Sequence, residues 1–272
     1  MQRSPRPVDP CRRRLALGLL GLPCAAARAA STAEPTAVPI LVYHRFAATA
    51  LDSMTLSLAR FEAQLGLIER LGGRVIAMDE LLAWRRGEQA RLPERALVLS
   101  ADDGHRSQYE QMAPRLRERG WPVTLFVYPS AISNASYAMR WEQLQALAAG
   151  PGCSVQSHSY WHPDFLRERR RQAPGEFRRF VDDQLRRAKR VLEQRLQHEV
   201  SQLAWPFGLS DPELWAQATA CGYRAGFVLG NRSVRPADPQ LALPRHLMVE
   251  SVGERALAAR LEAAFAAAEP AR

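Results

Sequence analysis

The chain has 272 residues, of which 47% are hydrophobic and 24% are charged, which suits one large α/β domain with a substantial core. Its formal net charge is +9, but residues 1–29 hold six arginines against the single acid Asp9 and contribute +5 of that charge. The arginines form no block interleaved with aromatic side chains, so the composition argues against a nucleic acid as partner.

Residues 1–29 have the pattern of a secretory signal peptide. The basic stretch Arg12-Arg13-Arg14 is followed by a short apolar run and by small residues, with Ala27-Arg28-Ala29 as a cleavage motif. The apolar run is too short to span a bilayer, so we expect export, removal of this segment, a periplasmic or extracellular location and no stable membrane span afterwards. A helical or disordered N-terminal arm is the alternative. Residues 30–38 are expected to form a linker, and 39–272 the folded domain.

Apolar runs and amphipathic stretches alternate along this domain. Short apolar runs are typical of strands buried on both faces, whereas apolar residues spaced three and four apart indicate helices. Gly72-Gly73 ends the first helix, and Asp79 is expected to cap the second. The predicted strands are 39–43, 75–77, 96–99, 123–127, 154–157, 203–205, 225–228 and 247–249. The predicted helices are 57–71, 79–86, one between Gly104 and Arg119, 141–149, 176–197, one from Asp211, and 254–268.

This order of elements predicts a parallel β/α architecture. Roughly seven strand–helix units are closer to a (β/α)7-like barrel than to an open sheet. No glycine-rich phosphate loop or dinucleotide fingerprint lies in the folded domain.

Two adjacent carboxylates, Asp102 and Asp103, follow the apolar run 96–99. In α/β folds the carboxyl ends of the strands carry ligands and catalytic groups. Neighbouring side chains in extended chain point apart, so we expect one aspartate to bind a metal and the other to handle a proton. The alternative is that Asp102-Asp103-Gly104 is only a turn.

His158 and His162 follow the predicted strand 154–157 at a spacing of four residues, before Pro163. This spacing allows both imidazoles to face one metal ion, although a histidine can also be a structural residue. With Asp103 as third ligand, the site would keep positions open for water and substrate, as catalytic metal sites do.

Three segments together resemble a known family. Ser100-Ala101-Asp102-Asp103-Gly104, His158-Ser159-Tyr160-Trp161-His162-Pro163 and Trp205-Pro206-Phe207-Gly208 are similar, in this order, to the first three motifs of the NodB-like polysaccharide deacetylases, carbohydrate esterase family 4. The resemblance covers about residues 39–248.

The resemblance implies roles for five of these residues. Asp103, His158 and His162 would bind the metal, usually zinc, and Asp102 would be the general base. The backbone N–H of Phe207 would help to stabilise the oxyanion. The implied activity is metal-dependent removal of acetyl groups from an N-acetylated amino-sugar polymer.

Three departures from the family pattern matter. Ala101 stands where the family usually has phenylalanine, which changes packing. Ala204 stands where it usually has arginine, so another group must orient Asp102, and Arg245 is the candidate. The family's late motif with the acid histidine is not found after Gly208.

The subgroup that acts on poly-N-acetylglucosamine offers an explanation, because its barrel is circularly permuted and the acid motif moves to the front. Leu41-Val42-Tyr43-His44 fits that motif, so the resemblance implies a permuted barrel with His44 as the general acid. His246 is the second candidate for the acid.

The sequence therefore predicts an exported zinc-dependent deacetylase whose partner is an acetylated polysaccharide. The absence of arginine at Ala204 keeps open a non-catalytic barrel that only binds polysaccharide. An O-acetyl esterase would use the same site. A glycosidase is disfavoured, because adjacent Asp102 and Asp103 cannot flank a glycosidic bond from opposite sides.

Overall fold

The computed structural model describes residues 37–266. The predicted signal peptide, most of the predicted linker and the last residues of the predicted closing helix lie outside this range. Val38 is fully buried and its N–H donates to the Val234 carbonyl oxygen at 2.8 Å. The folded domain therefore includes Val38, which we had expected in the linker.

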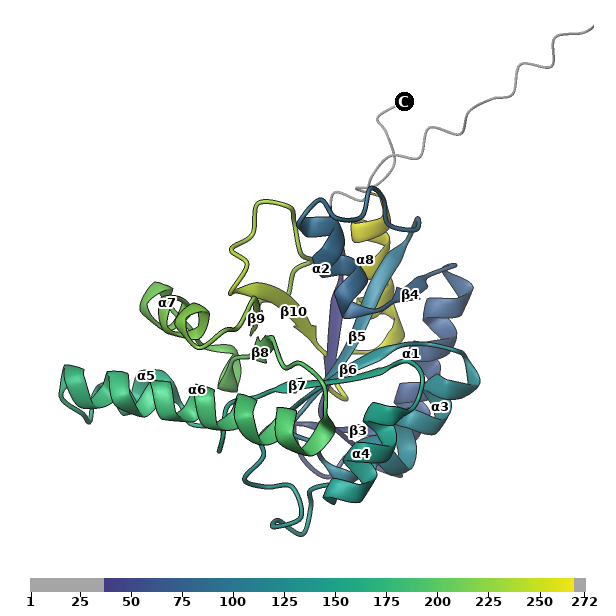
Figure 1. Cartoon of the computed structure of the whole chain (residues 1–272). Helices are drawn as coiled ribbons and strands as arrows, with labels where there is room; N and C mark the ends of the chain where they lie inside the picture. The colour runs from purple at the N-terminus through teal and green to yellow at the C-terminus, as the bar shows by residue number, and fades with distance from the viewer. Residues whose placement is uncertain (1–36, 267–272) are drawn as a thin grey trace, which may run out of the picture. The chain divides into compact units, whose positions relative to one another are not determined.

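Seven parallel strands form a closed barrel (Figure 1), which confirms the predicted (β/α)7-like fold. The strands follow one another in the order β1-β10-β9-β8-β7-β6-β5, and β1 also pairs with β5 and so closes the ring. An additional strand, β4, pairs with the first residues of β5. The strands are β1 Ile40–Tyr43, β4 Arg74–Ile76, β5 Ala96–Asp102, β6 Val123–Val127, β7 Cys153–Ser157, β8 Gln202–Ala204, β9 Ala225–Leu229 and β10 Leu243–Leu247.

Helices lie around the outside of the strands (Figure 1). They are α1 Leu58–Arg70, α2 Met78–Arg85, α3 Ala113–Glu118, α4 Trp141–Ala149, α5 Phe165–Arg169, α6 Pro174–Leu196, α7 Pro212–Ala220 and α8 Glu254–Ala266. Ser57 caps α1 by accepting from the Arg60 N–H, and Asp211 caps α7 by accepting from the N–H groups of Glu213 and Leu214. No helix within residues 37–266 is long and apolar enough to cross a membrane.

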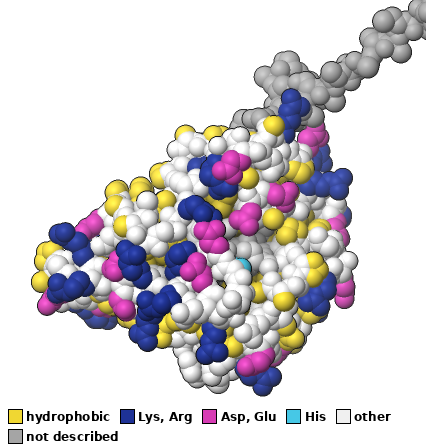
Figure 2. All heavy atoms as spheres, viewed as in Figure 1, with side chains coloured by type: hydrophobic (Ala, Val, Ile, Leu, Met, Phe, Trp, Pro, Cys, Tyr) yellow, Lys and Arg dark blue, Asp and Glu magenta, His cyan; other side chains and the backbone are white. Residues whose placement is uncertain are grey.

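The long helix α6 is amphipathic, as its sequence predicts. Its apolar face is buried through Phe177, Val181, Leu185 and Leu192. Its other face is rich in arginine, and Lys and Arg side chains gather over this part of the surface (Figure 2).

The strands are buried on both faces, which explains their continuous apolar sequences. In β5, Val98 faces the barrel interior with Phe126 and Phe227, whereas Leu99 packs outward against the helices. Phe126 on β6 and Phe227 on β9 meet across the interior with ring centroids 5.1 Å apart. Because side chains alternate along a strand, Asp102 at the end of β5 shares the interior face with Val98.

Some predictions about single elements were wrong. The last strand is β10, Leu243–Leu247, and not 247–249 as predicted. The prediction failed because Pro244, Arg245 and His246 do not form an apolar run, although all three are buried in the sheet. Asp79 does not cap α2, since the Glu80 carboxylate accepts from the Ala77 N–H instead. Four short elements were missed: β2 Arg45–Ala47, β3 Thr55–Ser57, α5 and the 3-10 turn η2 Pro206–Gly208.

Candidate active site

A buried ion pair lies at the centre of the site. Asp102, 2% exposed, ends β5, and the fully buried guanidinium of Arg245 reaches it from β10. Both contacts measure 2.7 Å, one between Arg245 Nη1 and Asp102 Oδ1 and one between Arg245 Nη2 and Asp102 Oδ2. The structure thus confirms Arg245 as the group that holds Asp102, in the absence of an arginine at Ala204.

The charge of Arg245 determines the protonation of Asp102. Burial by itself would raise the pKa of Asp102, but the attraction of Arg245, helped by His158, outweighs burial and lowers this pKa to about 2. The guanidinium carbon also lies 5.3 Å from the ring centroid of Phe126 and 6.0 Å from that of Phe227. Asp102 is therefore an ionised carboxylate at neutral pH, held in one orientation.

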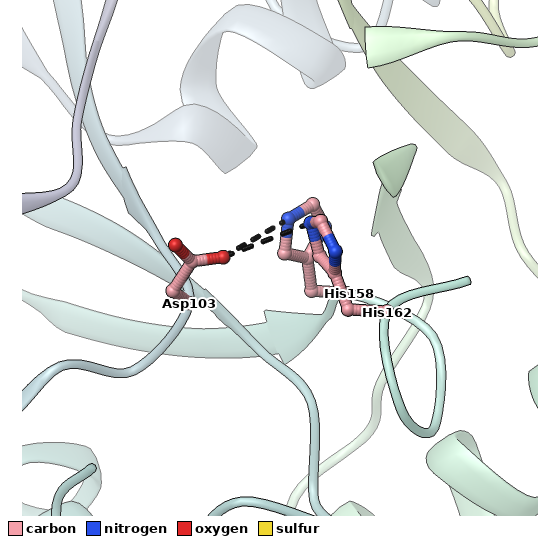
Figure 3. A group of neighbouring side chains, drawn as sticks. All are labelled: Asp103, His158 and His162. Atoms are coloured by element: carbon pink, nitrogen blue, oxygen red, sulfur yellow. Dashed lines mark ion pairs between the residues drawn. The ribbon is translucent and has the colours of Figure 1, made fainter. Parts of the chain in front are cut away.

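Asp103, His158 and His162 form the candidate metal centre (Figure 3). Their ligand atoms lie within 4.8 Å of one another, and each histidine Nε2 is 3.7 Å from Asp103 Oδ1. Donors around one zinc ion, at bond lengths of about 2.0–2.2 Å, are roughly 3.4 Å apart, so this set fits a divalent metal. His158 Nδ1 is 2.7 Å from the Ala204 carbonyl oxygen, which fixes the proton on Nδ1 and leaves Nε2 free as a ligand.

The backbone explains how adjacent aspartates face different ways. Asp102 is the last residue of β5, whereas Asp103 has a φ of 76° and turns out of the strand. His162 and Phe207 also lie in the left-handed region, with φ of 64° and 60°. Side-chain-bearing residues adopt this region at a cost of about 1–3 kcal/mol each, and such strain is concentrated at functional sites.

His44 follows β1 directly and lies beside the end of β5. The register pairs Tyr43 with Ala101, which brings His44 level with Asp102. Burial lowers the pKa of His44, while the negative charges of Asp102 and Asp103 oppose this effect. Its Nδ1 is buried and has no hydrogen-bond partner within residues 37–266. The structure therefore brings His44 to the same cluster of charges.

His246, the second candidate for the acid, faces elsewhere. It is adjacent to Arg245 on β10, and Arg245 points into the barrel toward Asp102. Side chains alternate along a strand, so His246 points outward, toward α8, and lines a cavity there with Arg260. Of the two candidates, only His44 is placed near Asp102.

Gln108 is a residue of this site that the sequence did not indicate. It begins the π-helical segment η1 Gln108–Met112 and is fully buried. Its side-chain amide donates to the carbonyl oxygen of His44 at 2.8 Å and to that of Asp102 at 2.5 Å. These contacts link the ends of β1 and β5, one residue beyond the last pair in their register. A glutamine at the start of a helix gives no sequence signal of such contacts.

Aromatic side chains surround the candidate metal centre. The ring of Phe207, 55% exposed, meets that of His162 edge-on, with centroids 4.6 Å apart. The Tyr128 ring lies 5.5 Å from that of His162, and its hydroxyl is 2.6 Å from the Tyr137 hydroxyl. The sequence indicated Phe207 through its backbone N–H but did not indicate Tyr128 and Tyr137.

Taken together, these residues are suited to hydrolysis at a carbonyl group. A divalent metal on Asp103, His158 and His162 would face the carboxylate of Asp102, since His158 Nε2 is 3.9 Å from Asp102 Oδ2. An ionised carboxylate beside such a metal can accept a proton from water, and a nearby imidazole can donate one.

Comparisons with known proteins agree on a family. The family model described as polysaccharide deacetylase matches residues 89–226, a range that contains Asp102, Asp103, His158, His162 and Phe207. The chain is 22% identical over 195 residues to YxkH of Bacillus subtilis (strain 168), which is named as a polysaccharide deacetylase. The match covers 72% of this chain and 65% of YxkH, so the chain spans just under two thirds of the length of this relative.

A second curated relative has a more specific name. The poly-beta-1,6-N-acetyl-D-glucosamine N-deacetylase of Staphylococcus aureus (strain MRSA252) is 17% identical over 217 residues, covering 78% of this chain and 74% of the relative.

Solved structures share the fold. The Streptococcus pyogenes deacetylase PplD in complex with acetate has a TM-score of 0.72 at 20% identity, and the match covers 87% of this chain and 100% of PplD. IcaB from Ammonifex degensii also has a TM-score of 0.72, at 23% identity, with 84% and 98% of the two chains covered.

Proposed function

The chain belongs to the polysaccharide deacetylase family, a family of hydrolases, and on this premise we propose that it removes acetyl groups from an N-acetylated amino-sugar polysaccharide with the help of a divalent metal. The observation that carries the proposal is the placement of the Asp102–Arg245 pair beside Asp103, His158 and His162. The Staphylococcus aureus relative, named for poly-beta-1,6-N-acetyl-D-glucosamine, supports a polymer of N-acetylglucosamine as the substrate.

Asp103, His158 and His162 would hold the metal, and zinc suits two imidazoles and one carboxylate. When bound there, the ion would polarise the acetyl carbonyl group and lower the pKa of a water molecule. His158 is prepared for this role because its Nδ1–H is already donated to the Ala204 carbonyl oxygen.

The protein's own groups would move the protons. Asp102 accepts a proton as water attacks the acetyl carbon, and Arg245 keeps Asp102 ionised until then. The backbone N–H of Phe207 donates to the oxygen that becomes negative. His44, in its protonated form, donates a proton to the amide nitrogen as the C–N bond breaks, so acetate and a free amine leave while Asp102 holds the proton taken from water. Gln108 holds the carbonyl groups of His44 and Asp102 and so positions acid and base relative to each other.

The test is an acetate-release screen across poly-N-acetylglucosamine, peptidoglycan and acetylxylan, with the metal content measured alongside. We expect acetate from an N-acetylated polymer, loss of release with a chelator and its return with zinc. Asp102→Asn is the matched inactive control. Release from acetylxylan alone would identify an O-acetyl esterase, and no release from any polymer would favour a barrel that only binds polysaccharide. The alanine at position 204 no longer argues for a barrel that only binds polysaccharide, because Arg245 makes the contact with Asp102.

Export belongs to the same proposal. It rests on the sequence of residues 1–29, and the test is the N-terminal residue of the protein recovered from its host. A chain that still begins at Met1 would contradict export. The circular permutation of the barrel also stays a prediction.

A further inference from the structure

A cavity of about 610 Å³ lies outside the barrel, between α8 and the segment Asn231–Arg235. We call it the α8 pocket. His246 on β10 lines it, whereas the adjacent Arg245 reaches Asp102 inside the barrel. Because neighbouring side chains of a strand point to opposite faces, the α8 pocket and the active site are on opposite sides of β10. The pocket is therefore a separate feature of the molecule.

Among its described lining residues, the α8 pocket carries only positive formal charge. Its described lining residues include Arg232, Arg235 and Arg260 but no aspartate or glutamate. Arg232 is paired with Asp238 through two contacts of 2.8 Å. No ion pair joins Arg235 or Arg260 to a carboxylate anywhere in residues 37–266. Within the described residues, two guanidinium groups of the pocket therefore have no carboxylate partner.

Two buried nitrogen atoms beside the pocket have no hydrogen-bond partner within the described residues. One is Nδ1 of His246, a side chain only 3% exposed, and the other is Nη1 of Arg260. His246 Nε2 lies 3.3 Å from Ser233 Oγ. If the Ser233 hydroxyl donates to Nε2, then Nδ1 carries the proton and is a donor. Buried donors are almost always satisfied in folded proteins, so these two indicate an acceptor that the described chain does not supply.

We propose that the α8 pocket binds the phosphate or carboxylate group of a small ligand, with Arg260 and His246 as its direct donors. A guanidinium group presents parallel N–H groups that match the oxygens of phosphate and carboxylate. The neutral imidazole of His246 adds one further N–H.

The rest of the pocket suits an uncharged part of the same ligand. Ala259, Ala263 and Ala264 present small side chains of α8 to the cavity. A volume of about 610 Å³ is within the range of small-molecule sites. Burial, and then the neighbouring Arg260, lower the pKa of His246 to about 4, so at neutral pH this imidazole is an uncharged donor.

The test is a titration of the full chain with inorganic phosphate, followed by calorimetry and by the NMR signals of the His246 ring. We expect saturable binding that shifts these signals, and binding weakened by roughly tenfold or more in Arg260→Met. Arg255→Met is the matched control, because Arg255 is exposed on the same helix and does not line the pocket. Acetate release should be the same in Arg260→Met as in the unchanged protein, which separates this inference from the proposed function.

Two results would overturn the inference: no saturable phosphate binding, or equal affinity in Arg260→Met and the unchanged protein. If Arg260→Met does not fold, His246→Gln provides the same comparison.

Discussion

Replacing Arg245 by methionine tests the central ion pair. The substitution removes the partner of a buried carboxylate, and breaking a buried pair in this way costs about 3–5 kcal/mol of unfolding free energy. It should also abolish acetate release, because burial would then raise the pKa of Asp102 against only the attraction of His158 and His44, and the carboxylate would lose the group that orients it. Acetate release and thermal or denaturant unfolding measure the two effects.

The pH dependence of stability has a definite sign. The pKa of Asp102 falls from its ordinary value of 3.8 to about 2 in the folded protein. A lowered carboxyl pKa stabilises the folded state above about pH 4, by about 2 kcal/mol here, and this stabilisation is lost as pH falls toward 2. The difference in unfolding free energy between the unchanged protein and Arg245→Met should therefore be small near pH 2 and large at pH 7.

A double variant separates the charge from the packing. Asp102→Leu combined with Arg245→Met leaves no unpaired charge, so it should recover at least half of the lost unfolding free energy while remaining inactive. Wild-type stability and activity in Arg245→Met, or a stability difference that does not change with pH, would refute the reasoning.

Three further substitutions, with Gln64→Met as a control, test the other residues of the site. Gln108→Met removes both contacts to the strand ends and should lower kcat by about 10–100-fold with unchanged metal content, because small misplacements of catalytic groups have effects of that size. Gln64 is another fully buried glutamine, and its side chain donates to one backbone carbonyl away from the site. Gln64→Met should therefore lower stability without lowering kcat. His44→Ala should fold and keep its metal but lose most turnover, and full activity would exclude His44 as the acid. His158→Ala should lose zinc by elemental analysis, and an undiminished metal content would argue against the metal centre.

The sequence predicted most of the barrel, because its strands are short apolar runs. Segments such as 123–127 and 141–149 match β6 and α4 without correction. Strand β10 was missed where Pro244, Arg245 and His246 interrupt the apolar pattern. A buried arginine in a strand is stable only because a carboxylate faces it, and that carboxylate belongs to another strand.

By itself, the sequence determined which residues are candidates for chemistry: Asp102 and Asp103 at the end of β5, the histidine pair after β7 and His44 after β1. Each group was recognisable because it lies at, or within a few residues of, the carboxyl end of its own strand. Only the tertiary structure decided that Arg245 holds Asp102, that Gln108 joins Asp102 to His44, and that His246 faces α8. The physical reason is separation along the chain. Arg245 and Asp102 are 143 positions apart, and only the closure and register of the barrel bring them to 2.7 Å.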